Sequence, residues 1–142
     1  MAKRLLYCLL LAFTTTSLFA QDSPVGRWET HDDETGEVKS IIKIYEQNGK
    51  FYGRIDEILT DNKDAVCTEC SGKQKNAPIL GMVIIKDLER DGDEWNGGTI
   101  FDPQKGAEYR LVAWFEDNPD EIFIRGKHWT GLFRTQTWTR RR

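Results

Sequence analysis

Apolar and polar residues alternate along much of the chain, in short runs separated by turn-forming residues. The clearest alternation lies in 107–116, where every second residue from Ala107 to Phe115 is apolar or aromatic, with Glu108 and Arg110 between them. A period of two predicts a β-strand with one buried face. No helical period of useful length follows residue 20, so the pattern indicates an all-β protein.

Similar runs, rich in β-branched and aromatic residues, predict eight strands. The strongest of the turn signals between them is Asn48-Gly49, because both residues tolerate the positive φ of a two-residue type I′ hairpin turn. We expect the strands at 25–32, 37–46, 50–59, 81–89, 94–101, 107–116, 121–126 and 133–140.

Most of these strands are joined by short turns, which is typical of an antiparallel up-and-down meander. An open sheet of this size would leave two unpaired edges, and closure into a barrel removes them. We therefore predict an eight-stranded antiparallel up-and-down barrel, which is wide enough to be filled by side chains or to hold one small ligand. A two-sheet sandwich is the alternative. The one long connection, 60–80, has a length that often indicates a functional or lid-like loop.

The N-terminal segment has the pattern of a secretory signal peptide. Lys3 and Arg4 precede an apolar run at 5–13, and small and polar residues lead to Ala20. The apolar run is shorter than the roughly 20 residues that span a bilayer. We predict a signal peptide at 1–20, cleavage between Ala20 and Gln21, and one domain at 21–142 in the periplasm or outside the cell, with no stable membrane span. The alternative is a buried N-terminal helix in a cytosolic protein.

Composition excludes further classes of protein. A content of 39% hydrophobic and 11% aromatic residues argues against a disordered chain. The formal net charge of −3 becomes more negative without Lys3 and Arg4, so charge gives no reason to expect nucleic-acid binding. The chain has no Gly-x-Ser-x-Gly elbow, phosphate loop or His-Glu-x-x-His motif. We therefore predict no catalytic residues, and the oligomeric state stays open.

Two cysteines, Cys67 and Cys70, would remain after cleavage. An even number in an oxidising compartment predicts a local disulfide, which would contribute about 2 kcal/mol because its loop is short. A redox pair and a metal site are the alternatives. A redox pair needs a helix N-terminus to stabilise a thiolate, and zinc needs three or four ligands, whereas His31 and His128 are distant in the sequence. We predict no metal and no cofactor.

Several motifs resemble those of a known family. The segment Gly26-Arg27-Trp28 opens the first predicted strand and Arg140 closes the last. The other motifs are Tyr52-Gly53-Arg54-Ile55, Gly81-Met82, Trp95 with Gly97-Gly98, Asp102-Pro103, Arg125-Gly126 and the run from Phe133 to Arg140. Together they resemble the small secreted bacterial proteins grouped as domain of unknown function family 2147. The resemblance implies a lipocalin-like barrel in which Arg140 covers Trp28, and it implies no established chemistry.

The candidates for ligand contact are polar and aromatic residues within strands and turns, namely Arg54, Trp95, Tyr109, Arg125 and Trp129. Arg54 and Arg125, like Arg134 and Gln136, have apolar neighbours and lie either on the outer face or inside the barrel as polar contacts for a ligand. Small inward residues such as Gly53 and Gly97 would leave room for a ligand, whereas aromatic residues would fill it.

We therefore expect an exported barrel that binds a small apolar or amphipathic molecule. The first alternative is a structural or interaction protein of the cell envelope, with a filled barrel and no ligand. The second, which the sequence favours less, is an enzyme whose site is the loop of Cys67 and Cys70 or a cluster that forms only in the folded barrel.

Overall fold

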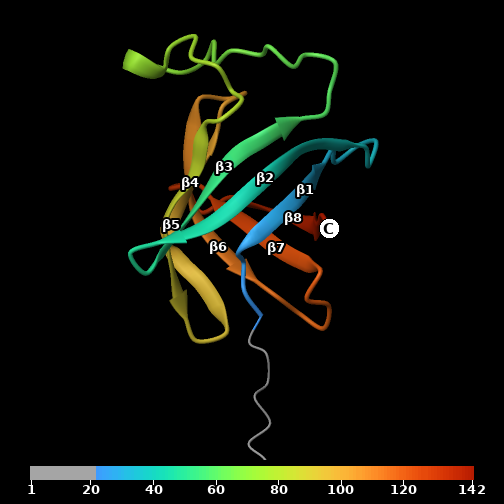
Figure 1. The fold of residues 1–142 in the computed structure, drawn as a ribbon. Coiled ribbons are helices and arrows are strands. Elements are labelled where there is room, and N and C mark those ends of the chain that lie inside the picture. The colour runs from blue at the N-terminus through green and yellow to red at the C-terminus, as the bar shows by residue number, and fades with distance from the viewer. Residues whose placement is uncertain (1–21) are drawn as a thin grey trace, which may run out of the picture.

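Eight antiparallel strands form most of the structure, a computed structural model that describes residues 22–142. The predicted signal peptide, with its cleavage site at Ala20 and Gln21, lies outside the described residues. Each strand pairs with the next, and the last returns to the first, so that the sheet is a closed barrel (Figure 1). The strands are β1 (Gly26–His31), β2 (Val38–Gln47), β3 (Lys50–Ile58), β4 (Val83–Asp91), β5 (Glu94–Asp102), β6 (Ala107–Trp114), β7 (Glu121–Lys127) and β8 (Phe133–Arg140).

The strand pattern of the sequence is confirmed, because all eight predicted strands are present with ends within two residues of those observed. Closure of the sheet excludes the two-sheet sandwich. Asn48 and Gly49 have φ values of 53° and 78° and join Gln47 to Lys50, which confirms the predicted two-residue hairpin.

Alternation sets which side chains form the core. On β6, Leu111 and Ala113 are buried inside the barrel, whereas Glu108 and Arg110 are exposed outside. Trp114 lies on the outer face, where its ring stacks on Phe123 of β7 with 5.4 Å between ring centroids. The period of two along this strand therefore separates the interior from the surface, as the sequence predicts.

The expectation that Gly97 faces inward is wrong. The register of β5 and β6 shifts between Trp95 and Gly98, and Gly97 lies in this bulge, exposed and with φ of 75°. Gly53 does face inward, but it leaves no free space. A Cβ atom there would lie 2.9 Å from Cδ1 of Ile85, so that this isoleucine fills the room the glycine provides.

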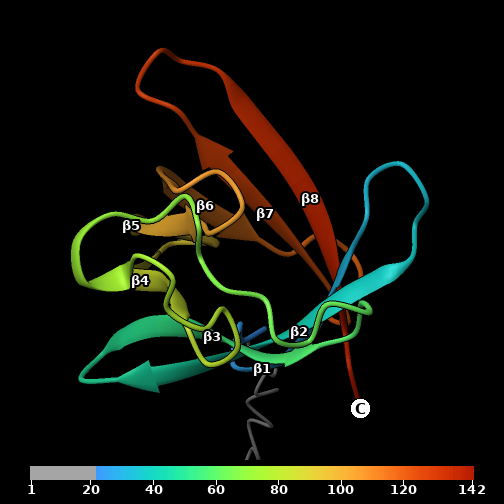
Figure 2. The same ribbon diagram turned by 90° about the horizontal axis from the view of Figure 1, so that it is seen from above.

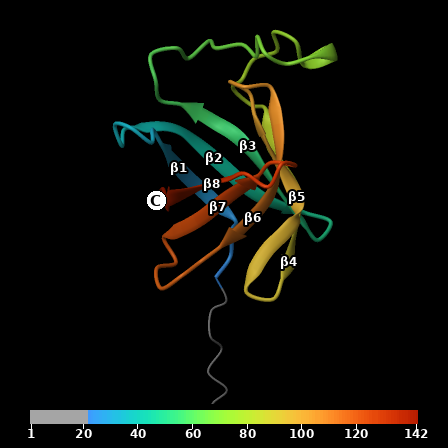
Figure 3. The same cartoon turned by 180° about the vertical axis from the view of Figure 1, so that it is seen from behind.

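The two ends of the barrel differ. Figures 1 and 3 show the turns β4–β5 and β6–β7 at one end, and the turn β5–β6 and the loop 59–82 at the other. We name the first the closed end, because Trp28, Trp95 and Phe115 fill it, with ring centroids of Phe115 5.9 Å and 5.5 Å from the two indoles. The other end is named the mouth. The loops β1–β2 and β7–β8 also lie there.

The seam between β1 and β8 is the shortest strand pairing in the barrel. It consists of the partners Trp28 with Arg140 and Glu29 with Thr139, both toward the closed end. Closer to the mouth, the two strands diverge. The barrel is thus fastened at the closed end and less tightly joined at the mouth.

Candidate functional site

A cavity of about 620 Å³ occupies the half of the barrel next to the mouth. Its deeper walls are aliphatic and aromatic because the inward positions of six strands carry such residues. These include Ile42, Ile55, Ile84, Ile100, Ile124 and Trp138. The volume lies within the range of small-molecule sites, and an apolar wall favours the apolar part of a ligand.

The rim of the cavity carries an excess of positive charge. Lys39, Lys105 and Arg134 lie in the lining, as do both histidines of the chain, His31 and His128. Among residues 22–142, neither lysine of the rim forms an ion pair.

Asp102 is the one carboxylate in the described lining. Its Oδ1 accepts hydrogen bonds from the backbone N–H groups of Gln104 and Lys105, at 2.9 Å and 3.4 Å. Asp102 therefore closes the β5–β6 turn, and part of its charge is engaged by backbone donors. An anionic group at the rim would find Lys39 and Lys105, neither of which forms an ion pair within residues 22–142.

A carboxylate on the β1–β2 loop bridges the open part of the seam. Asp33 forms an ion pair with Arg134 and accepts a hydrogen bond of 3.0 Å from Nε2 of Gln136. The neighbouring Asp32 holds this loop in shape. The backbone N–H groups of Thr35 and Glu34 donate to its carboxylate, at 2.9 Å and 3.0 Å, and these bonds hold the pKa of Asp32 below its usual value.

The loop 59–82 covers one side of the mouth and contributes Asn62, Ala65 and Ile79 to the cavity wall. Backbone hydrogen bonds fix its shape, among them Cys67 N–H to the carbonyl oxygen of Ala77 at 2.8 Å. This covering position fits the lid-like role that the length of the connection suggests.

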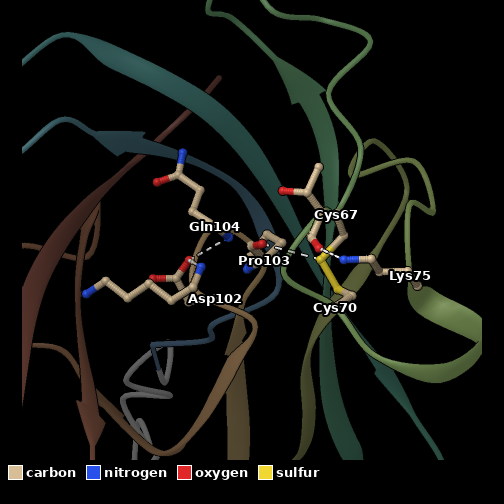
Figure 4. Close-up of a disulfide and its surroundings, with 8 residues drawn as sticks. Cys67, Cys70, Lys75, Asp102, Pro103 and Gln104 are labelled. Carbon is tan, nitrogen blue, oxygen red and sulfur yellow. Dashed lines mark hydrogen bonds between the residues drawn. A yellow bond between two sulfur atoms is a disulfide. The ribbon is translucent and has the colours of Figure 1, made fainter.

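The disulfide between Cys67 and Cys70 staples this loop, with 5.3 Å between the two Cα atoms, and both residues are buried. Figure 4 shows the disulfide beside the β5–β6 turn, where Sγ of Cys67 lies 3.3 Å from the carbonyl oxygen of Pro103. The approach is closest at Gly106, where a Cβ atom would lie 2.1 Å from the carbonyl oxygen of Glu69. The disulfide thus holds the surface by which the loop packs on the barrel.

Of the five candidates for ligand contact, the structure places Tyr109 in the cavity lining. Arg54 lies on the outer face, because Gly53 and Ile55 take the inward positions of β3, and its Nη2 donates to Asp56 at 3.2 Å. Trp95 is buried at the closed end, outside the cavity lining.

The other two candidates lie near the mouth but outside the cavity. Arg125 is on the outer face of β7, where its guanidinium lies 4.9 Å from the ring centroid of Trp114 and 4.7 Å from that of Phe133. Trp129 is exposed on the β7–β8 loop, beside His128. The structure therefore does not bring the five candidates together.

Arg134 and Gln136, unlike Arg54 and Arg125, line the cavity, since they share the inward side of β8 with Trp138. Sequence reasoning missed the contribution of His31 and His128, which are separated by most of the chain. The predicted topology could have indicated that these histidines lie close together, because the connections of an up-and-down barrel alternate between its two ends. The first and seventh connections therefore lie at the same end.

Trp28 and Arg140 belong to the closed end. The guanidinium of Arg140 lies 4.2 Å from the ring centroid of Trp28, whose Nε1 donates to the carbonyl oxygen of Pro24 at 2.8 Å. Arg140 also donates to the carbonyl oxygens of Val25 and Pro119, both at 3.1 Å. These two residues fasten the barrel and take no part in the cavity.

Comparison with known proteins assigns the chain to a family. The family described as "Uncharacterized protein conserved in bacteria (DUF2147)" matches residues 26–140. The chain belongs to this family. The resemblance found in the sequence motifs is thereby confirmed, and it covers all eight strands of the barrel.

One solved structure is similar to this DUF2147 chain over most of its length. It is described as "Protein HP1028 from the human pathogen Helicobacter pylori belongs to the lipocalin family". The two are 21% identical, the match covers 84% of each chain, and the TM-score is 0.73. The chain matches none of the curated proteins. At this identity the structural likeness shows the fold, which is a lipocalin-like barrel as predicted.

Within residues 22–142, no helix has the length and apolar character to cross a bilayer. The same part of the chain contains no group of three or more His, Cys, Asp or Glu side chains arranged to hold a metal ion.

Proposed function

We propose that the protein is an exported binding protein that holds one small amphipathic molecule inside its barrel. The observation that carries the proposal is the cavity of about 620 Å³, apolar at depth and polar at its rim. Export, to the periplasm or out of the cell, rests on the signal-peptide pattern of residues 1–20.

A filled barrel acting only through its surface is less well supported. The aromatic cluster of Trp28, Trp95 and Phe115 fills the closed end and ends there. Toward the mouth the inward positions carry shorter aliphatic side chains, such as Ile42 and Ile84, which line free space. The interior is thus packed toward the closed end and contains a cavity toward the mouth.

The distribution of polarity orients the ligand. Its apolar part would lie among the isoleucines and Trp138, and its polar end would lie at the rim near Lys39 and Lys105. Since neither lysine forms an ion pair within the described residues, an anionic end group is favoured over a neutral one.

Native mass spectrometry of protein purified from the exported fraction tests the proposal directly. A co-purifying small molecule of defined mass would support it, whereas bare protein from several growth conditions and extracts would count against it. The mass of the chain itself tests removal of residues 1–20.

Titration with defined probes tests the position of the site. Dodecanoate and its methyl ester share an apolar chain and differ in charge. Ile100→Trp places an indole in the cavity and should weaken the binding of both probes at least about tenfold. Val112→Trp adds the same group on the outer face of β6 and should change neither affinity. Equal effects of the two variants would place the binding elsewhere.

A second pair of variants tests the charge preference. Lys39→Gln and Lys105→Gln should each weaken dodecanoate about threefold to fivefold and leave the ester unchanged, the range expected of a partly exposed ion pair. Lys86→Gln, which removes a lysine outside the cavity, is the matched control. Loss of dodecanoate binding in the control would show an effect of net charge alone.

A further inference from the structure

Exposed apolar side chains gather at the mouth of the barrel. Seven large hydrophobic residues are exposed in the described chain, and all but Val25 lie on mouth loops or at their edges. They are Leu59, Val66, Leu80, Trp129, Leu132 and Phe133. Isolated apolar residues on a surface are normal, but a cluster at one end indicates a surface that contacts something.

The β7–β8 hairpin presents the strongest part of this cluster. Trp129 is 85% exposed, Leu132 75% and Phe133 62%. The loop between the strands is short and held by hydrogen bonds, with His128 N–H donating to the carbonyl oxygen of Leu132 at 2.7 Å. Figure 2 shows the hairpin reaching outward from the barrel. We name Trp129, Leu132 and Phe133 the apolar tip.

Positive charge surrounds the apolar tip, in a chain with a net charge of −3. Beyond Glu121 the sequence contains no Asp or Glu, whereas Arg125 and Lys127 lie on the outer face of β7. Arg110 of β6 is the strand partner of Lys127. The carboxylates on this side of the mouth are Glu108, on the same face of β6, Asp102 in the cavity lining, and those of the β1–β2 loop, where Asp33 is paired with Arg134 and is flanked by Asp32 and Glu34. The hairpin therefore carries an excess of cations.

Aromatic and aliphatic side chains backed by Lys and Arg are the combination that inserts at the interface of an anionic bilayer. A protein partner fits less well, because a stable interface needs about 800 Å² on each side, and a projecting tip of three side chains offers less. We infer that the apolar tip docks the protein on an anionic lipid surface. Leu132 and Phe133 also line the cavity, so docking would bring the mouth to the membrane.

Vesicle flotation tests the inference, with exported protein whose mass shows that residues 1–20 are absent. The protein should bind vesicles of phosphatidylcholine mixed with phosphatidylglycerol and should bind pure phosphatidylcholine more weakly. The variant with Trp129→Ser, Leu132→Ser and Phe133→Ser should lose more than about 100-fold in partition, because three apolar side chains no longer leave water. Val25→Ser removes an exposed apolar residue at the closed end and should have no effect.

Two double variants with the same change in net charge test whether the cations near the apolar tip are needed for binding to anionic vesicles. Arg110→Gln with Lys127→Gln should reduce partition onto the anionic vesicles about 30-fold. Lys43→Gln with Lys86→Gln makes the same change in net charge on strands remote from the tip, and should leave partition unchanged. Equal losses in the two double variants would show that overall charge drives the binding, and would overturn the inference.

A fluorescence measurement tests the same inference without the triple variant, so that the result does not depend on whether that variant folds. Lipids brominated near the interface should quench the tryptophan emission of the wild type, and Trp129→Phe should remove most of that quenching while vesicle binding persists. Quenching that persists in Trp129→Phe, or a wild type that binds no vesicles, would overturn the inference. Ile100→Trp should still bind vesicles, so that the cavity and the docking surface are tested separately.

Discussion

Replacing Arg140 by alanine should lower the free energy of unfolding by about 3 kcal/mol, because this side chain joins separate parts of the closed end. Its guanidinium lies over Trp28 and donates to the carbonyl oxygens of Ser23, Val25 and Pro119, at 3.2, 3.1 and 3.1 Å. It also forms an ion pair of 3.4 Å with Asp120.

The magnitude follows from these contacts. A partly desolvated cation over an indole contributes about 1 to 2 kcal/mol, and each hydrogen bond from a charged donor contributes about 1.5 kcal/mol or more. The sum overstates the loss, because the Arg140 side chain is 24% exposed and water can reach part of the freed carbonyl groups. Arg140→Lys keeps the cation but not the planar fork of donors, so it should cost about half as much.

Urea unfolding followed by tryptophan fluorescence measures these differences in the free energy of unfolding. The slope of this free energy against urea concentration should be the same in the variants as in the wild type. Arg142→Ala is the control, because its side chain is 80% exposed and pairs with the same Asp120, and it should cost less than about 0.5 kcal/mol. The reasoning is refuted if Arg140→Ala costs no more than Arg142→Ala, or if Arg140→Lys is as stable as the wild type.

Three further predictions concern the mouth. Replacing both Cys67 and Cys70 by alanine should lower the unfolding free energy by about 2 kcal/mol, measured in urea, and a loss above about 4 kcal/mol would show that the disulfide supports more than its own loop. Gly106→Ala should increase hydrogen exchange across 67–76, because its Cβ would meet the carbonyl oxygen of Glu69. Gly36→Ala, at φ of 74° with no neighbour within 4 Å, should cost only the backbone strain and leave that segment protected. The pKa of the Asp32 carboxyl is lower in the folded protein than in the unfolded chain. Its contribution to stability is therefore complete at a pH above its pKa in the unfolded chain, and is lost as the pH falls through its lower pKa in the folded protein. In an NMR titration the pKa of its carboxyl should therefore lie below the usual value of an aspartate, and Asp32→Asn should flatten the dependence of stability on pH below about pH 4.

The strands could be predicted because each depends on local alternation and on turn residues such as Asn48-Gly49. It was harder to predict from the sequence whether an individual side chain points into or out of the barrel, although the alternation contains part of this information. Counting alternate residues outward from Ile55 or Ile124 places Arg54 and Arg125 on the outer face. The bulge at Gly97 could not be counted in this way, because an extra residue inverts the alternation beyond it.

The cavity itself depends on relations that no single segment contains. Lys39 and Lys105 lie on different strands and turns, and they share a rim only because the sheet closes. The packing of the loop 59–82 on Gly106 likewise needs the three-dimensional arrangement. The sequence could therefore predict a barrel with a candidate lid, whereas the position and charge of the cavity required the structure.

The short seam between β1 and β8 has a consequence for how the barrel can open. Between most neighbouring strands, widening the mouth would break backbone hydrogen bonds, such as those around Asp102 and Ala107 at the end of β5 and β6. Between β1 and β8 the ladder ends at Glu29 and Thr139, and the contacts of Asp33 are what span the gap beyond it. Displacing this one loop carboxylate would therefore remove the side-chain contacts that span the seam there, and it would leave the strand pairing between β1 and β8 intact.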